Sequence, residues 1–337
     1  MSSMQSDGRD RQFTSFQELA TYFQTQLQKP LASLEQDHLK PLPVQGDDVA
    51  DKVRDSLGHA REFLGQGRFK DADDQAWSIL RLVNMGRKED ILAHSPSELA
   101  QAVRPDCREY VGGALALIGT SYRNRQRHFD AVSFLERSIY LDPKNTFALR
   151  NLSDLCVLVK PRDLEGVEKV GEEISREVDL GIATTQKLLR LLGISKGHIE
   201  GRHGLATEQT EGEMGVNICW ALNNQASLLY RRARDKMHRL GNDASARQTF
   251  KDSIQHSETT LSVVGLPRKL DKVSQRLGIN PTLTGENAER ASRALVTIGL
   301  CNYHMGDETT AKKAYELALV IKPDSKVARD NLERIRN

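Results

Sequence analysis

The chain has 337 residues, of which 38% are hydrophobic and 28% charged, and 48 basic against 46 acidic residues leave a formal net charge of +2. This composition supplies a sizeable core and excludes disordered and collagen-like chains, and the balanced charge excludes a global attraction to nucleic acid or an anionic membrane. The four cysteines lie far apart with no CxxC pair, which fits reduced thiols rather than a disulfide scaffold or a zinc ribbon. Because no segment resembles a signal sequence or a membrane span, we expect a soluble, cytoplasmic protein that contacts no membrane.

The spacing of apolar residues predicts an all-α protein. Apolar positions recur at i, i+3, i+4 and i+7 through most of the chain, while the alternation typical of strands is missing. The first predicted helix begins at a capping box of Ser15 and Glu18 and carries Phe16 and Phe23 on one face. It belongs to an N-terminal extension over 1–48 that ends in a Pro- and Gly-containing linker. This extension is expected to cover the first helical hairpin, or to bind a partner or a second copy of the chain as a homodimer.

Two windows of 34 residues, 112–145 and 292–325, align with each other without a gap. Each has a glycine in a first predicted helix, an alanine in a second and a proline at its end. The matching pairs are Gly119 and Gly299, Ala131 and Ala311, and Pro143 and Pro323. A small residue lets the two helices approach closely, and proline ends the second helix. Each window therefore predicts a helical hairpin whose remaining apolar face needs a neighbour.

These windows resemble the tetratricopeptide repeat family, whose pattern is W-x2-L-G-x2-Y, then A-x3-F, then P at a period of 34 residues. The resemblance implies an irregular α-solenoid of tetratricopeptide-like helical hairpins over 49–337. Besides the two clear windows, the array comprises three degenerate units at about 53–86, 146–177 and 215–264. It ends in a capping helix at 326–336. Two connecting regions rich in glycine and polar residues, 201–215 and 265–287, interrupt the array.

Motifs of catalysis are missing from the sequence. It contains no GxxxxGK[ST] phosphate loop, no GxSxG elbow, no HExxH and no GxGxxG that opens a helix after a strand. His198 and His203 lie five residues apart among glycines, without the one-face geometry of helical metal ligands. We therefore predict no enzymatic activity, no cofactor and no metal site.

In proteins of the family that the chain resembles, the first helices of successive hairpins line a concave groove that binds peptides. The polar and aromatic residues predicted at these lining positions are Arg123, Asn124, Arg150, Asn151, Arg293 and Tyr303. Arginine offers bidentate hydrogen bonds to carboxylates, so this set suits an acidic or backbone-exposed peptide. We predict a protein-interaction adaptor or scaffold with a partner of unknown identity, although each of these charges is equally compatible with a solvated rim.

The segment 184–202 supports an alternative, in which the protein is a peptide-responsive transcriptional regulator. Leucines, a turn at Gly193 and two isoleucines resemble a helix-turn-helix unit. The predicted phosphate contacts are Lys187, Arg190, Lys196 and Arg202. Leu189 stands where the two helices need a small residue, and Gly197 weakens the second helix. A nucleic-acid partner is therefore disfavoured, and the simpler hypothesis is a solenoid helix that ends at Gly193.

Overall fold

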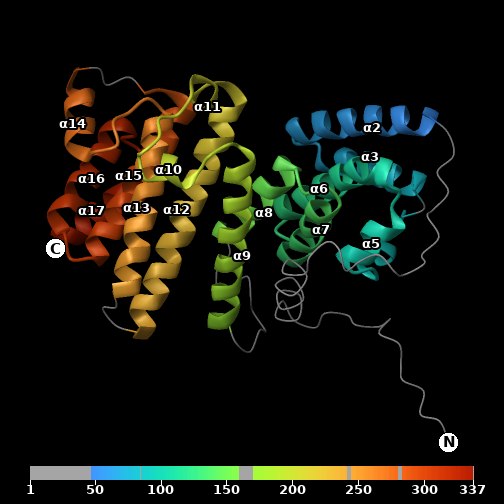
Figure 1. Cartoon of the computed structure of the whole chain (residues 1–337), viewed down its shortest axis with the longest axis horizontal. Coiled ribbons are helices and arrows are strands. Elements are labelled where there is room, and N and C mark those ends of the chain that lie inside the picture. The colour runs from blue at the N-terminus through green and yellow to red at the C-terminus, as the bar shows by residue number, and fades with distance from the viewer. Residues whose placement is uncertain (1–46, 84, 159–169, 241–243, 280–282, 337) are drawn as a thin grey trace, which may run out of the picture. The chain divides into compact units, whose positions relative to one another are not determined.

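The computed structural model describes residues 47–83, 85–158, 170–240, 244–279 and 283–336 (Figure 1). Every regular element in these ranges is a helix and none is a strand, which confirms the all-α prediction. The predicted N-terminal helix with Ser15 and Glu18 lies outside the described residues. None of the described helices combines the length and the apolar character that a bilayer crossing requires.

The chain divides into two compact units, described separately here as unit 1 and unit 2. Of the described residues, unit 1 holds 47–155 and 170–173, and unit 2 holds 156–158 and 174–336. The prediction that one array runs over 49–337 stays a prediction.

Unit 1 is built from helical hairpins. Its helices are α2 (Asp47–Gly65), α3 (Phe69–Leu82), α4 (Lys88–Leu92), α5 (Pro96–Ala102), the 3-10 helix η2 (Pro105–Cys107), α6 (Arg108–Asn124), α7 (His128–Leu141) and most of α8 (Thr146–Leu158). Helix α2 packs on α3, α6 packs on α7, and α3 joins the two hairpins by packing on α6. The predicted unit at 112–145 contains most of α6 and all of α7.

The α6–α7 hairpin shows why its sequence needs small residues. A Cβ atom added to Gly119 would lie 2.7 Å from Cγ of Leu135 and 3.2 Å from the carbonyl oxygen of Ala131. One end of the hairpin is fixed by the Ser138 hydroxyl, which donates to the carbonyl of Gly112 at 2.7 Å. The glycine therefore permits the close helix approach that the sequence predicts.

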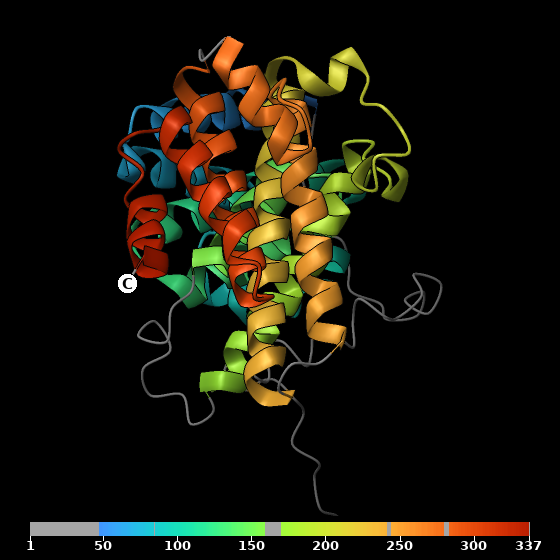
Figure 2. The ribbon, with the colours of Figure 1, turned by 90° about the vertical axis from the view of Figure 1, so that its left-hand side faces the viewer.

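Unit 2 is a second set of packed helices. Its elements are α9 (Val170–Leu191, in this unit from Ile174), α10 (Lys196–Ile199), α11 (Thr207–Thr210), α12 (Gly212–Leu240), α13 (Ala244–Val263), α14 (Leu270–Ile279), α15 (Gly285–His304), α16 (Glu308–Ile321) and α17 (Lys326–Arg336). Helices α12 and α13 form one hairpin and α15 and α16 the next, and α15 packs on both helices of the first (Figure 1 and Figure 2). Helix α17 packs on α16 at the predicted place of the capping helix.

The core of unit 2 repeats the close approach seen in unit 1. A Cβ atom on Gly299 would lie 2.8 Å from Cδ1 of Tyr315, whose side chain is buried. Phe250 of α13 and Cys301 of α15 are also fully buried, and Tyr230 of α12 packs against them. The same residue types that identify the hairpin in the sequence thus form its core.

Candidate functional site

The first helices of the hairpins in unit 2, α12 and α15, together with the capping helix α17, carry a cluster of aromatic and cationic side chains, which we call the first-helix cluster. Its members are Tyr230, Arg234, His238, Tyr303, His304 and Arg334. They come from the C-terminal halves of all three helices.

An aromatic network holds this cluster in place. The Tyr230 hydroxyl lies 3.1 Å from Nε2 of His304, and the two ring centroids are 5.6 Å apart. The buried ring of Phe250 stacks under His304, with centroids 5.8 Å apart and an interplanar angle of 4°. Tyr303 is half-buried and meets the His304 ring edge-on at 5.8 Å. These rings give the cluster a rigid apolar floor.

The arginines of the cluster favour a negatively charged ligand. The Arg234 guanidinium lies 5.9 Å from the centre of the Tyr230 ring, and Arg334 acts on Tyr230 from α17. Within the described residues neither arginine forms an ion pair, and both are exposed. Burial raises the pKa of Tyr230, so its hydroxyl stays protonated. Burial, followed by Arg234 and His238, lowers the pKa of His304.

Two of the predicted contact residues lie on α15. Arg293 is half-buried and donates through Nη2 to Oδ1 of the buried Asn224 on α12 at 3.2 Å. Tyr303 belongs to the first-helix cluster, about 15 Å further along the helix at 1.5 Å per residue. The structure thus places both residues in unit 2, where Tyr303 shares the cluster with Arg234 and Arg334.

The other four predicted contacts lie in unit 1. Nη1 of Arg123 on α6 pairs with Oδ2 of Asp154 on α8 at 3.0 Å. Asn151 is buried and donates to the carbonyl of Phe147 in its own helix at 2.8 Å. Asn124 is exposed at the end of α6, and Arg150 is half-buried. The structure therefore gives Arg123 and Asn151 intramolecular partners.

The helix-turn-helix alternative depends on a second helix long enough to enter a DNA groove. In the structure Gly193 makes the predicted turn with φ +76°, but α10 contains only four residues. Arg268 donates to the carbonyl oxygens of His198 and Ile199, which holds the segment against its own unit. The geometry at 184–202 therefore offers no recognition helix.

Two basic residues of that segment pair with a carboxylate of the segment itself. Glu200 pairs with both Lys196, at 3.5 Å, and Arg202. Lys187 is half-buried and Arg190 is exposed on α9. The rings of His198 and His203 are 5.5 Å apart, and Nδ1 of His198 accepts a hydrogen bond from the backbone N–H of Ser195. In the described residues no group of three or more His, Cys, Asp or Glu side chains has the arrangement of a metal site.

Sequence reasoning missed Tyr230, Arg234 and Arg334. Helix α12 has 29 residues, so its N-terminal end does not set the register of the hairpin. The second helix of the hairpin sets the register instead. Ala246 precedes Ala311 by 65 residues, and Phe250 precedes Tyr315 by the same number. The same offset aligns Tyr230 with Leu295 in the first helix.

Comparison with known proteins agrees with this geometry. A family model for the tetratricopeptide repeat matches residues 292–325, the same window that the sequence pattern predicts as a hairpin. These residues begin within α15, include α16 and end just before α17. No curated protein gives a significant match to the chain. Residues 292–325 therefore form a tetratricopeptide repeat, and the packed helical hairpins on either side of them are consistent with a tetratricopeptide-like all-α fold.

Proposed function

We propose that the protein is a non-catalytic adaptor or scaffold that binds an acidic peptide segment of a partner protein through the first-helix cluster of unit 2. Tetratricopeptide repeats form protein-interaction surfaces, which supports the general class. The proposal includes a cytoplasmic location, which the four free cysteines favour because thiols stay reduced there.

The observation that carries the proposal is the pair of exposed arginines beside half-buried tyrosines. Arg234 and Arg334 form no ion pair within the described residues, whereas Arg232 pairs with Asp179 at 2.6 Å and Arg239 with Asp235 at 2.5 Å. Guanidinium groups bind carboxylates in bidentate geometry, and tyrosine and arginine supply most of the binding energy of interfaces. The cluster thus presents two guanidinium groups that pair with no described carboxylate, and one of them is held beside Tyr230.

The ligand is expected to be short and extended. A ligand that reaches from the cluster at Tyr303 to Arg293 would span about 15 Å, which equals about five residues of extended chain at roughly 3.3 Å each. Carboxylates of the peptide would bind Arg234 and Arg334, and an apolar or aromatic residue would lie against Tyr303. Because the helices are already packed together, binding needs little reorganisation.

The test selects peptides from a phage-displayed library on the full-length chain and measures their affinity by fluorescence polarisation. The expected result is enrichment of Asp and Glu, with affinity that falls steeply with salt and drops at least tenfold in Arg234→Glu and Arg334→Glu. Arg276→Glu is the matched control, because Arg276 is also exposed but lies on α14.

Two results contradict the proposal. The first is selection of peptides without acidic residues, and the second is equal affinity of the three variants and the unmodified chain. Arg150→Glu is a further arm that tests the contacts predicted in unit 1. Loss of binding in that variant alone assigns the ligand to unit 1 and rejects the cluster.

A further inference from the structure

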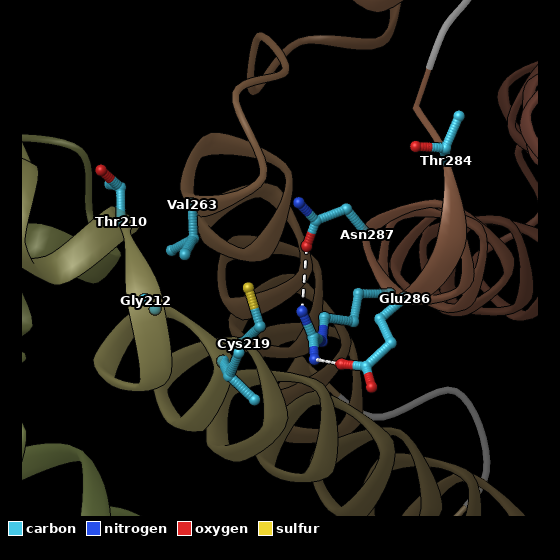
Figure 3. A pocket seen from close by; sticks show the side chains of 10 residues that line it. Thr210, Gly212, Cys219, Val263, Thr284, Glu286 and Asn287 are labelled. Carbon is cyan, nitrogen blue, oxygen red and sulfur yellow. Dashed lines mark hydrogen bonds and ion pairs between the residues drawn. The ribbon is translucent and has the colours of Figure 1, made fainter.

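A cavity of about 310 Å³ lies in unit 2 where the N-terminal ends of α12 and α15 meet the C-terminal end of α13 (Figure 3). At roughly 30 Å³ per water molecule, this volume equals about ten waters, which is enough for a small organic molecule. Its walls include parts of both regions that the repeat pattern leaves as connections, with Thr210 on one side and Thr284 on the other. The cavity is separate from the first-helix cluster, which involves the opposite ends of α12 and α15.

A buried guanidinium forms the polar end of the cavity. Arg290 is 7% exposed, and its Nη1 donates to Oδ1 of Asn287 at 2.9 Å. Its Nη2 pairs with a carboxylate oxygen of Glu286. A guanidinium has five N–H donors, and the described residues accept hydrogen bonds from two of them. The guanidinium therefore keeps N–H groups that can donate to the acceptor oxygens of a ligand.

The carboxylate of Glu286, which pairs with Arg290 in the structure, is a weak partner for it. The side chain of Glu286 is 79% exposed, against 9% for Arg290, and both belong to the same helix four residues apart. An exposed carboxylate gains little from such a pair because it is also well solvated in water. Another carboxylate can therefore replace it at small cost.

Part of the cavity wall is apolar, while Thr210 and Thr284 add polar side chains elsewhere. Val216 and Val263 contribute aliphatic surface, and the buried thiol of Cys219 lies beside them. Burial raises the pKa of Cys219 to about 12, so the thiol carries no charge at neutral pH. The cavity thus combines one cationic group with an aliphatic patch formed by two valines, an arrangement that suits an acid with a short carbon chain.

We propose that this cavity binds a small aliphatic carboxylate. Its carboxylate would replace that of Glu286 on Arg290, where two parallel N–H groups match the two carboxylate oxygens. Its carbon chain would lie against Val216 and Val263. Arg290 precedes the matched repeat at 292–325 and lies outside the six predicted contacts, so the site is independent of peptide binding at the first-helix cluster.

The experiment is isothermal titration calorimetry on the full-length chain with acetate, propionate and butyrate at constant ionic strength. We expect saturable binding that tightens about fourfold for each added methylene group, since each removes apolar surface from water. Butyramide, which has the same shape without the charge, is expected not to bind. Circular dichroism melting checks that each variant is folded.

Two substitutions of glutamate give the sharpest comparison. Glu286→Gln removes the internal competitor for Arg290 and is expected to tighten butyrate binding about twofold to fivefold. Glu316→Gln makes the same charge change at an exposed position of α16 and is expected to leave affinity unchanged. A merely structural ion pair would give no gain in affinity when it is removed.

Two further variants test the cavity itself. Val216→Phe fills the space while leaving Arg290 in place, and Arg290→Gln removes the charge. Both are expected to abolish butyrate binding. If Arg290→Gln fails to fold, the Glu286→Gln and Val216→Phe variants decide the result.

Three results overturn the proposal: no saturable binding of any of the three acids, binding of butyramide as tight as that of butyrate, or equal affinities of Glu286→Gln and Glu316→Gln. A peptide C-terminus presents the same chemical group, so the acetylated tripeptide Ala-Ala-Val with a free carboxylate is a final arm. Weaker binding of this tripeptide than of butyrate supports a free small acid. Tighter binding rejects a free small acid as the ligand.

Discussion

The hydroxyl of Tyr230 on α12 lies 3.1 Å from Nε2 of His304 on α15, so one hydrogen bond joins the first helices of two consecutive hairpins. Phe250 stacks beneath His304, and Arg234 lies over the Tyr230 ring. The contact couples the stability of the hairpins to the protonation of one imidazole at the surface proposed for peptide binding.

Stability is predicted to fall as the pH drops below about 6.5. Burial lowers the pKa of both His304 and His256 in the folded protein. The unfolded chain, with histidine pKa values near 6.5, therefore binds protons first as the pH falls, and the folded state loses stability until its own lower pKa is passed. Urea unfolding at about pH 7.5 and pH 5.5 measures the difference.

Substitution of His304 tests the origin of this pH dependence. In His304→Gln the free energy of unfolding is expected to change less between the two pH values than in the unmodified chain. His59→Gln, at an exposed position of α2, is the control and is expected to keep the full change. An unaltered pH dependence in His304→Gln would contradict the assignment.

Gly299→Ala is predicted to destabilise unit 2 by about 1–3 kcal/mol, the usual cost of overpacking a core. The added Cβ would lie 2.8 Å from Cδ1 of Tyr315, which has no free space into which to move because it is buried. Gly278→Ala on α14 meets no atom within 4 Å and is expected to show no loss. Denaturant unfolding of both variants checks the prediction, and similar stabilities would refute close packing at Gly299.

Arg123 is predicted to stabilise unit 1 through Asp154. Their ion pair joins α6 to α8 at 3.0 Å, and the Asp154 side chain is only 9% exposed. A double-mutant cycle with Arg123→Ala and Asp154→Ala is expected to give a coupling energy of about 1–3 kcal/mol. Asn124→Ala, at the exposed end of α6, is expected to change stability by less than about 0.5 kcal/mol. A coupling energy near zero would return Arg123 to the candidates for partner contact.

Cysteine reactivity is predicted to follow burial. Burial raises the pKa of both Cys219 and Cys301 to about 12, and Cys156 is also buried. Cys107 is half-buried and is expected to react first with iodoacetamide in the folded protein, while the other three react only after denaturation. Mass spectrometry of peptides after timed labelling measures the order, and early modification of Cys301 would contradict the packing of the α12–α15 core.

The sequence predicts the hairpins well because their signals are local. Gly299, Ala311 and Tyr315 stand at fixed spacings within one window, and each contacts another part of the same hairpin. The register of α12 is harder to predict, since the N-terminal part of this helix lies outside the repeat pattern and only Ala246 and Phe250 on the next helix establish the register. Arg334 was missed because its place beside Tyr230 depends on where α17 packs.

The segment 184–202 shows the limit of a local pattern. Leucine spacing and the turn at Gly193 match a helix-turn-helix unit, yet α10 ends after one turn. Gly201 has φ +75°, which only glycine adopts easily. Arg268, about 70 residues later in the chain, donates hydrogen bonds to the carbonyl oxygens of His198 and Ile199. A contact so distant in sequence leaves no signal in the segment itself.

The sequence by itself determined the all-α class, the positions of the clear hairpins and the tetratricopeptide repeat at 292–325, since helix periodicity and close helix approach depend on neighbouring residues. Only the tertiary structure decided which charged side chains have partners. Arg123 and Arg234 look alike in the sequence as arginines on first helices, but folding brings Asp154 to the first and no described carboxylate to the second. The cavity at Arg290 likewise exists only because two connecting regions meet in space. Ion pairs and cavities depend on distances between residues far apart in the chain, and the spacing of residues along a helix does not encode those distances.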